Sequence, residues 1–224
     1  MLINADFTRR ATMAPEEYQW VDSPQMGVER VMLDRVGEEK ARATSIVRYA
    51  PNSHFPRHQH PGGEEIFVLS GVFSDEEGDY PAGWYVRNPP GSSHQPSSED
   101  GATILVKLWQ MRPDDTHRVR IDTHDPSSWL SRNGRDVCPL FSDDLERVCI
   151  QRVAPDEVMF ADPVDSAEML VLAGDVMVAD RSYPRGGWIR LPPGHYPDVI
   201  AGTQGATVYL KTGHLAHATT ETPP

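Results

Sequence analysis

The chain has 224 residues, which is enough for one large β domain or two small ones. Its formal net charge of -12 argues against nucleic acid and anionic membrane surfaces as partners, because the sequence has no excess of Lys and Arg to neutralise phosphate. The 17 glycines and 20 prolines predict many turns, and therefore many short strands.

Cysteine usage and the apolar runs give expectations about the compartment. The two cysteines, Cys138 and Cys149, do not form a Cys-x-x-Cys pair, which argues against a thiolate zinc site. The N-terminus lacks a basic segment followed by an apolar one, and the longest apolar run, residues 169–178, is interrupted by Gly174 and Asp175. We therefore expect a soluble, cytoplasmic protein with buried, free thiols and no transmembrane segment.

Strand-like segments follow one another from residue 26. Residues 26–50 read as strands because apolar and polar positions alternate and the later part is rich in Val, Ile and Thr. Residues 65–71, 84–88 and 102–110 are predicted to be further strands, and the first two end at a glycine or at a proline-rich turn. Residues 112–144 are the least regular stretch, for which we expect a linker with one crossing strand and a short helix.

Three histidines and a glutamate stand at spacings that suit one metal ion. His58 and His60 are two residues apart, so on a strand their side chains point to the same face. Glu64 keeps this parity if residues 61–63 form a turn that preserves the register, and His94 follows a Pro-Pro-Gly break. Three imidazole nitrogens and one carboxylate suit Zn, Fe(II), Mn, Ni or Cu better than Ca or Mg. The sequence therefore predicts a metal site made by His58, His60, Glu64 and His94.

An internal repeat shows how the chain is organised. Three segments recur at a constant offset of 103 residues: 68–71 as 171–174, 80–83 as 183–186, and 87–91 as 190–194. The chain is therefore predicted to hold two copies of one β module, each of a natural domain size.

The second copy lacks the metal-binding side chains. At the same offset, His58, His60, Glu64 and His94 correspond to Ala161, Pro163, Ala167 and Pro197. The turn signals survive while the ligands do not, so we expect the second module to keep the fold and to bind no metal.

Several residues near the motif have weaker claims to a function. Glu65 has the opposite parity to Glu64 and is expected at the solvent or at an interface. His54 is a candidate for a pocket or supporting role, although exposure is the simpler expectation. Trp84, Tyr85 and Trp109 could line the metal pocket, but aromatic residues on strands usually pack in the core. The remaining histidines are expected on the surface: His117, His124, His195, His214 and His217.

These spacings resemble the two motifs of the cupin family. His58, His60, Glu64 and Gly71 match the first motif, and Gly83, Pro89, Gly91 and His94 match the second. Asn52 replaces the glycine that opens the first motif, and Ser98 replaces an asparagine that often closes the second. The resemblance implies an all-β fold with two tandem cupin jelly-roll barrels. The expected domains are a metal-binding barrel at residues 1–115, a linker at 116–144 and a degenerate barrel with a frayed tail at 145–224.

The sequence of residues 58–94 is similar to that of a narrower group, the cupin domain of ChrR-type anti-sigma factors. Those proteins join a zinc-binding, sigma-inhibiting helical domain to a cupin that responds to singlet-oxygen or peroxide stress. These 224 residues contain no His-x3-Cys-x2-Cys element, so we expect the sigma-binding helical domain to be absent, which puts direct inhibition of a sigma factor in doubt. The resemblance implies a role in oxidative-stress-responsive transcription regulation through metal-site sensing and protein contacts.

Two other functions stay open. Similar motif sequences occur in Fe(II)-dependent cupin dioxygenases that cleave a small diketone or acetophenone-like compound. The chain could also be a small-molecule binding module in which the metal anchors the ligand. The expected cofactor is one divalent metal ion, with zinc favoured and Fe(II), Mn or Ni as alternatives. The expected partners are a small-molecule ligand or oxidant at the metal, a sigma factor or regulator protein, and a second copy in a homodimer.

Overall fold

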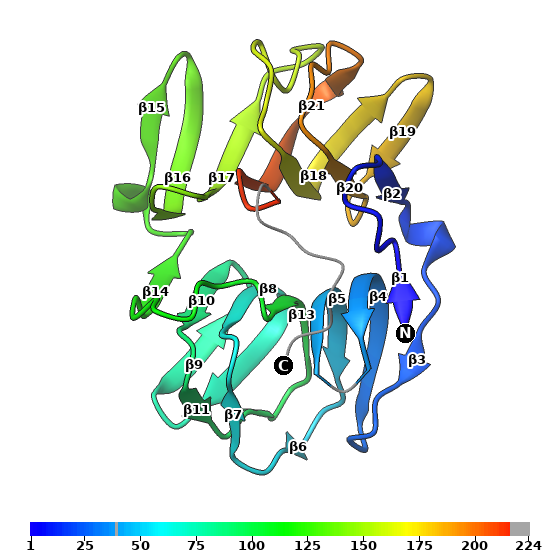
Figure 1. Ribbon diagram of the computed structural model, residues 1–224. Helices are drawn as coiled ribbons and strands as arrows, with labels where there is room; N and C mark the ends of the chain where they lie inside the picture. The colour runs from blue at the N-terminus through cyan, green and yellow to red at the C-terminus, as the bar shows by residue number, and fades with distance from the viewer. Residues whose placement is uncertain (39, 216–224) are drawn as a thin grey trace. The chain divides into compact units, whose positions relative to one another are not determined.

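The computed structural model describes residues 1–38 and 40–215, and regular structure in them is almost entirely antiparallel β-strand (Figure 1). The only helical elements in the described residues are two short 3-10 turns, η1 (Pro15–Glu17) and η2 (Pro126–Ser128). None of these described helices is long and apolar enough to cross a membrane. The chain forms two compact units, which we name unit 1 (residues 1–5 and 19–124) and unit 2 (residues 6–18 and 125–215).

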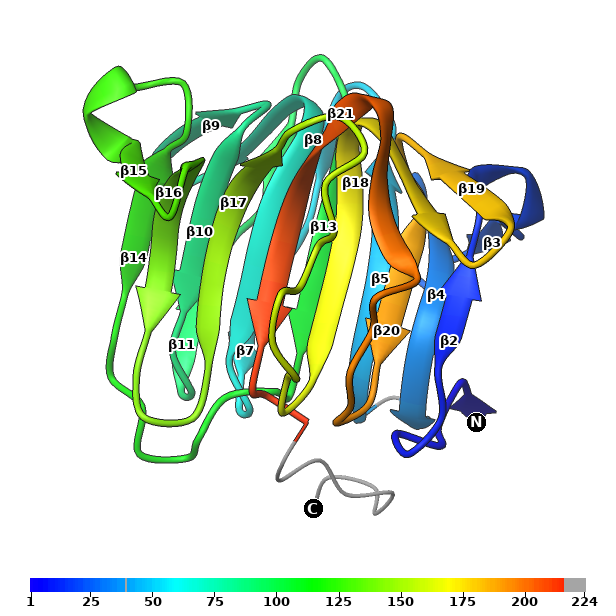
Figure 2. The same cartoon turned by 90° about the horizontal axis from the view of Figure 1, so that it is seen from above.

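Unit 1 is built on one path of hydrogen-bonded strands. In spatial order the strands are β1 (Leu2–Ile3), β4 (Val28–Gly37), β5 (Ala41–Tyr49), β13 (Ala102–Leu108), β8 (Glu64–Asp75), β10 (Trp84–Asn88) and β14 (Val119–Asp122). Figure 2 shows β5, β13, β8 and β10 running alongside one another. Short strands join this path: β3 (Val21–Asp22), β6 (Ser53–His54), β9 (Gly78–Pro81) and β12 (Ser97–Ser98). A separate two-stranded sheet pairs β7 (His58–His60) with β11 (Ser92–His94).

Unit 2 repeats the same strand path. Its order is β15 (Leu130–Arg132), β16 (Arg135–Ser142), β17 (Arg147–Val153), β21 (Val199–Thr212), β18 (Ala167–Val178), β20 (Trp188–Leu191) and β2 (Ala11–Met13), with β19 (Arg181–Pro184) beside β18. Both ends of β18 lie 103 residues after the ends of β8, and β19 follows β9 by the same offset. The sequence repeat is therefore a repeat of topology as well.

The boundaries of the units differ from the expected domains 1–115, 116–144 and 145–224. Residues 116–144 were expected to be a linker, but they contain β14, β15 and β16, all of which pair with strands of the main sheets. At the other end of the chain, β2 pairs with β20 and belongs to unit 2, although it lies among the first residues. The physical reason is that β2 and β14 are short edge strands, which are held by backbone hydrogen bonds and need little apolar patterning of their own.

A β-bulge recurs at the same place in both units. The register of β8 against β13 shifts so that Leu69 has no partner, and the register of β18 against β21 shifts at Leu172 in the same way. Gly71 and Gly174 follow these bulges with φ of 71° and 68°. A Cβ at Gly71 would lie 1.9 Å from the carbonyl oxygen of Gly101, so only glycine fits there.

Each unit has its own apolar core between the faces of its strands. The unit 1 core is formed by Val28, Val47, Phe55, Ile66, Val68, Phe73, Tyr80, Val86, Ala102, Ile104 and Val106. The unit 2 core includes Met159, Phe160, Met169, Val171, Ile189, Leu191, Tyr196, Val199, Val208 and Leu210. Side chains from every second position of the strands make up these cores, as alternation along a half-buried strand requires.

A buried ionic cluster also recurs in both units. Glu65 lies opposite Arg87 on one neighbouring strand and opposite Lys107 on the other, and Glu168 lies in the same way between Arg190 and Lys211. All six residues are buried, and Arg87 Nη1 lies 3.3 Å from Glu65 Oε2.

Two of the weaker sequence expectations are corrected by this cluster. Glu65 was expected to face solvent or an interface, but it is buried and its carboxylate pairs with Arg87, because Arg87 and Lys107 lie directly opposite it on the two neighbouring strands. His214 was expected on the surface, but its side chain is buried and Nε2 lies 3.0 Å from Glu168 Oε2. His217 lies outside the described residues.

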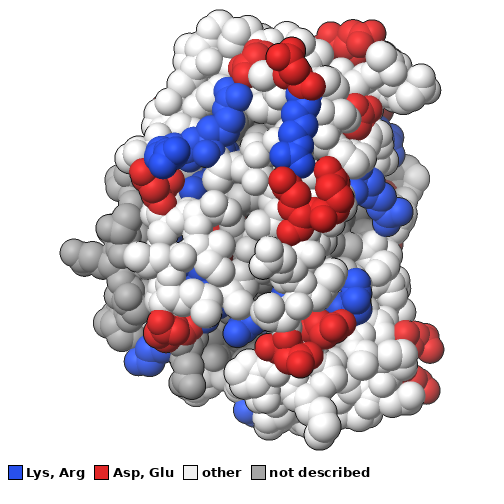
Figure 3. All heavy atoms as spheres, turned by 90° about the vertical axis from the view of Figure 1, so that its right-hand side faces the viewer, with Lys and Arg blue, Asp and Glu red and all other residues white. Residues whose placement is uncertain are grey.

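The surface carries mixed charges. On the face shown in Figure 3, acidic and basic side chains lie next to one another, and the described residues form no continuous basic patch there. Some charged side chains of unit 2 form ion pairs, including Arg181 with Glu16 and Arg10 with Asp198.

The two cysteines are free and are expected to be unreactive in the folded protein. Burial raises the pKa of the Cys138 thiol to about 11, and burial together with the neighbouring Cys138 raises the pKa of Cys149 to about 12. A thiol with a raised pKa holds little thiolate at pH 8, roughly one part in a thousand for a pKa of about 11. Ellman's reagent should therefore react slowly with the native protein and should titrate both thiols after denaturation. Rapid reaction of either thiol in the native state would contradict this assignment.

Candidate metal centre

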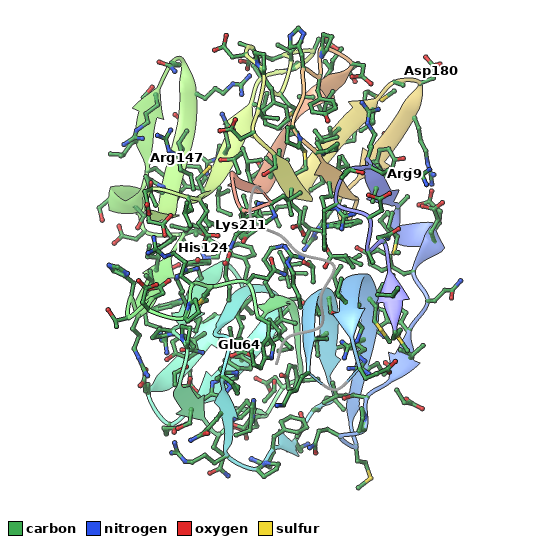
Figure 4. All side chains as sticks on the ribbon, viewed as in Figure 1. Arg9, Glu64, His124, Arg147, Asp180 and Lys211 are labelled. Atoms are coloured by element: carbon green, nitrogen blue, oxygen red, sulfur yellow. The ribbon has the colours of Figure 1, made fainter. Side chains whose placement is uncertain are left out.

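Three short elements of unit 1 bring the predicted ligands together. β7 and β11 pair so that His94 lies directly opposite His58, and His60 lies opposite Ser92. The chain then turns at residues 61–63, where the Gly63 amide donates to the His60 carbonyl at 3.1 Å, and β8 begins at Glu64. Glu64 therefore keeps the face of His60. Figure 4 shows Glu64 among the strands of unit 1.

The four side chains form one cluster. His58, His60, Glu64 and His94 each offer a ligand atom, and these atoms lie within 4.8 Å of one another. The centroids of the three imidazole rings are 4.6 to 5.0 Å apart. Glu64 Oε2 lies 3.4 Å from His60 Nε2 and 3.5 Å from His94 Nε2. This arrangement could hold one metal ion, and among the described residues it is the one such group that was found.

The protonation and burial of the cluster fit a metal ion. His60, Glu64 and His94 are buried, while His58 is exposed at the edge. His60 Nε2 is buried and makes no hydrogen bond, even though Glu64 is nearby. Burial lowers the pKa of His60, which favours the neutral imidazole with a free lone pair. A buried nitrogen without a partner is costly, and a metal ion at this point would satisfy it.

Neighbouring polar groups orient three of the ligands. His58 Nδ1 lies 3.2 Å from the Pro56 carbonyl oxygen, and His94 Nδ1 lies 3.4 Å from Asp75 Oδ2. Asn88 Nδ2 donates to Glu64 Oε2 at 3.2 Å. The contacts to the two histidines leave the second nitrogen of each ring free for a metal, and Asn88 holds the Glu64 oxygen that also lies nearest to His60 and His94.

Asp75 is the strongest of these supporting residues. Its carboxylate accepts hydrogen bonds from the Tyr80 hydroxyl and from the Glu77 amide, so it is held in place on the side of His94 that faces away from the cluster. Burial alone would lower the pKa of His94, but the Asp75 hydrogen bond and the charges of Glu64 and Asp75 outweigh it and raise this pKa. Asp75 therefore fixes the ring of His94 and increases its basicity.

The substitution Asp75→Asn should lower the metal affinity by about 10- to 100-fold, the range found for supporting partners of ligating histidines. The measurement is a competition titration with a chromophoric chelator. Asp79→Asn is the matched control, because Asp79 is exposed on the neighbouring strand and touches no ligand. An unchanged affinity in Asp75→Asn would show that Asp75 does not position His94.

A cavity adjoins the cluster inside unit 1. Its volume is about 270 Å³, and Glu64 and His58 contribute to its wall. The rest of the wall is largely apolar, with Arg30, Tyr49, Ser23 and Gln25 as further polar residues. Burial raises the pKa of Tyr49 well above its usual value, and the charge of Glu64 adds to this effect, so the phenol stays protonated. The metal position is therefore open to a small molecule on the cavity side.

Other residues considered from the sequence take no part in the site. Trp84, Tyr85 and Trp109 do not line the cavity, and Trp109 packs against the turn at Gly62. His54 and His195 are exposed, and the side chains of His117 and His124 are also mostly in solvent.

The equivalent region of unit 2 has lost both ligand strands. A single antiparallel bridge between Val164 and Gly194 stands where β7 and β11 pair in unit 1. Phe160 and Tyr196 are buried and belong to the apolar core.

Four residues at the candidate site were not predicted from the sequence: Arg30, Tyr49, Asp75 and Asn88. Only Asn88 carried a signal, because it directly precedes the Pro-Pro-Gly break that leads to His94.

Comparison with known families gives one match. Residues 8–112 match the family described as the ChrR cupin-like domain. A comparison with curated proteins found no match.

Solved structures with the same fold cover nearly the whole chain. A putative dioxygenase from Nostoc punctiforme is 15% identical, with a TM-score of 0.67, and the match covers 100% of this chain and 87% of that one. A putative glyoxylate-induced protein from Pseudomonas aeruginosa is 16% identical, with a TM-score of 0.70 and coverage of 98% and 93%. A bacterial pirin from Escherichia coli in complex with nickel(II) is 12% identical, with a TM-score of 0.62 and coverage of 91% and 98%. At these identities the similarity shows the fold alone.

Proposed function

We propose that the chain is a cupin, because residues 8–112 match the ChrR cupin-like domain, and that unit 1 binds a small organic molecule at one divalent metal ion. The observation that carries this proposal is the cavity of about 270 Å³, whose wall includes Glu64 and His58. A metal site that only held the fold together would need no such access.

The two units are proposed to be tandem cupin barrels, of which only the first has kept its ligands. The matching strand orders, the shared bulges at Leu69 and Leu172, and the loss of the His-bearing strands in unit 2 support this. Unit 2 then contributes structure, and one metal ion is expected per chain.

The reaction class that fits best is oxidation of a small chelating compound. A divalent metal ion polarises a carbonyl group and, if it is redox-active, supports oxidation by O2. Three histidines and one carboxylate leave coordination positions open in five- or six-coordinate geometry. In a dioxygenase reaction both atoms of O2 enter the two products of C–C cleavage, so no external reductant is needed. The substrate class is a small diketone or an acetophenone-like compound, and Fe(II) is the metal for this activity.

This chain's residues have defined tasks in that scheme. His58, His60, Glu64 and His94 hold the metal, and Asp75 and Asn88 orient two of them. The apolar wall of the cavity excludes water from the reacting carbonyl. Tyr49 stays protonated, so it can donate a hydrogen bond to an oxygen of the substrate.

A second function is favoured by the family match and by one feature of the cluster. The ChrR-type resemblance supports a role in oxidative-stress-responsive regulation, with zinc as the metal and a sigma factor or another regulator as the partner. His58 is exposed at the edge of the cluster, so an oxidant could reach the metal position directly.

Oxygen uptake separates the two functions. The protein is loaded with Fe(II) under anaerobic conditions, and O2 consumption is recorded with pentane-2,4-dione and 2-hydroxyacetophenone. Uptake that is stoichiometric with substrate and lost in His58→Ala supports the enzyme. No uptake, together with co-purification of a sigma factor, would contradict the enzyme and support the regulator.

A further inference from the structure

Arg30 places a positive charge in the wall of the unit 1 cavity. It lies on β4 two residues after Val28, and both side chains line the cavity, as the alternation of the strand requires. Its neighbours across the sheet are Val47 on β5 and Val21 on β3, neither of which can accept a hydrogen bond through its side chain.

The side chain of Arg30 is half-buried, and among residues 1–38 and 40–215 it has no recognised hydrogen bond or ion pair to another side chain. Its Nε is buried and makes no hydrogen bond, and no ion pair involves this side chain in the described part of the chain. Other arginines of unit 1 are paired, for example Arg87 with Glu65 and Arg48 with Glu29. A buried donor left without an acceptor costs about 1 to 3 kcal/mol, and more when it is charged. An unpaired arginine that faces a cavity is therefore a candidate anchor for a ligand.

The cavity offers little else to balance this charge. Glu64 is the only carboxylate in its wall, and that carboxylate belongs to the metal cluster. Once a divalent ion is bound, the positive charges of the ion and of Arg30 exceed the single negative charge of Glu64. Arg30 also repels another arginine: burial lowers the pKa of Arg35, and the charge of Arg30 lowers it further. The electrostatics of the cavity therefore favour an anion.

The remaining wall limits the size and character of that anion. Apolar side chains from three strands and one loop form most of the surface: Val28, Val47, Phe55, Ile104, Val106 and Leu108. The volume of about 270 Å³ corresponds to about nine water molecules at about 30 Å³ each, so a ligand has about ten non-hydrogen atoms. Ser23 and Gln25 add neutral polar groups to the wall that holds Arg30.

We propose that the cavity binds a small organic carboxylate with an apolar middle, whose carboxylate pairs with Arg30 while its chelating oxygen atoms bind the metal held by Glu64 and its neighbours. The proposal rests on the proposed function, because the metal is the second anchor. It sharpens the substrate class from a neutral carbonyl compound to an anionic one. Arg30 is then a specificity-determining residue, since planar guanidinium groups pair with carboxylates through two parallel hydrogen bonds.

The test compares two ligands that differ only in charge. 3,4-Dihydroxybenzoate has 11 non-hydrogen atoms, about the number that the cavity holds, and it carries a chelating diol, an apolar ring and a carboxylate. 3,4-Dihydroxybenzamide replaces the carboxylate by a neutral group of the same shape. Isothermal titration calorimetry on the Zn2+-loaded protein should show the benzoate binding at least about tenfold more tightly, as expected for a charge-assisted pair. The variant Arg30→Met should lose this preference and keep the affinity for the amide.

Controls distinguish failure of this proposal from failure of the metal site. Arg48→Met makes the same change on β5, but Arg48 lies outside the cavity wall, so the preference should persist. The metal content of each variant is measured in parallel. Three results in a protein that holds its metal would overturn the proposal of an anionic ligand and leave the metal site standing. They are equal affinity for both ligands, a preference for the benzoate that survives Arg30→Met, and no binding of either compound. If the wild-type protein holds no metal, the proposed function is wrong. In that case a preference for the benzoate that is lost in Arg30→Met could still be measured, so the two failures can be told apart.

Thermal stability separates a ligand anchor from a structural arginine. Because the side chain of Arg30 makes no hydrogen bond or ion pair in the described residues, Arg30→Met should leave the melting temperature of the ligand-free protein unchanged or raise it. A clear drop in melting temperature would show that Arg30 supports the fold, and the binding result for that variant would then be assigned to loss of structure. In that case Arg30→Lys decides the point: a point charge should restore part of the carboxylate preference.

Discussion

Replacing His94 by alanine is expected to abolish stoichiometric metal binding. His94 supplies one of the four ligand atoms that lie within 4.8 Å of one another, and its ring is held by Asp75. With the ring removed, the site keeps two histidines and a carboxylate, and the buried Glu64 loses one of the two histidines that lie beside its Oε2. After Zn2+ loading and dialysis, the metal content should fall from about one ion per chain to less than about one tenth of that value.

The control for this prediction is His195→Ala. His195 is exposed in unit 2, close in sequence to the position that corresponds to His94, and it should leave the metal content unchanged. Metal retained at one ion per chain in His94→Ala would show that the fourth ligand is assigned wrongly. Loss of metal in His195→Ala would place a ligand in unit 2.

The largest expected effect on stability comes from Gly71→Ala. The residue has φ of 71°, and a Cβ would lie 1.9 Å from the Gly101 carbonyl oxygen, so the backbone of one strand would have to move. The strain of the left-handed conformation, about 1 kcal/mol, and overpacking of up to about 3 kcal/mol together give about 4 kcal/mol. For a chain of this size the melting temperature should fall by about 8 to 16 °C. Circular dichroism melting measures it.

Gly91→Ala separates the two parts of this effect. Gly91 is in the same unit and has φ of 80°, but a Cβ there would meet nothing within 4 Å. Its replacement should cost only the conformational part, about 1 kcal/mol. Equal loss of stability in the two variants would contradict the close approach at the bulge. Gly174→Ala should behave like Gly71→Ala, because its Cβ would lie 2.0 Å from the Gly205 carbonyl oxygen.

Most of the candidate metal cluster could be predicted from the sequence, because three of its four residues lie close together in the chain. His58 and His60 share one short strand, and Glu64 follows after a turn that preserves the face. His94 lies far away in the chain, but the Pro-Pro-Gly turn places β11 beside β7. The repeat at offset 103 was equally visible, because turn glycines and prolines are fixed by backbone conformation and not by the metal.

The supporting residues could not be predicted, and the bulge at Leu69 explains the case of Asp75. Glu64 and Asp75 are eleven residues apart on β8, so a regular strand would place them on opposite faces. The unpaired Leu69 inserts one residue and reverses the parity, which brings Asp75 to the side of His94. A bulge of this kind follows from backbone contacts with a distant strand, which the local sequence does not record.

The cavity, and the sheet to which each edge strand belongs, could not be predicted either, because both depend on contacts between residues far apart in the sequence. Arg30 reads as an ordinary polar position on an alternating strand, and only the packing of β4, β5 and β13 around one space shows that it lacks a partner. Likewise, nothing in residues 11–13 or 119–122 shows which sheet each segment joins, because edge strands are selected by free backbone groups.

The protein is expected to bind one metal ion per chain, in unit 1 and not in unit 2. Isothermal titration of the metal-free wild-type protein with Zn2+ tests it most directly, with the total metal content checked by mass spectrometry after dialysis. We expect a single tight site in the wild-type protein, and we expect this site to disappear in His94→Ala. A second tight site in the wild-type protein, or none, would contradict it.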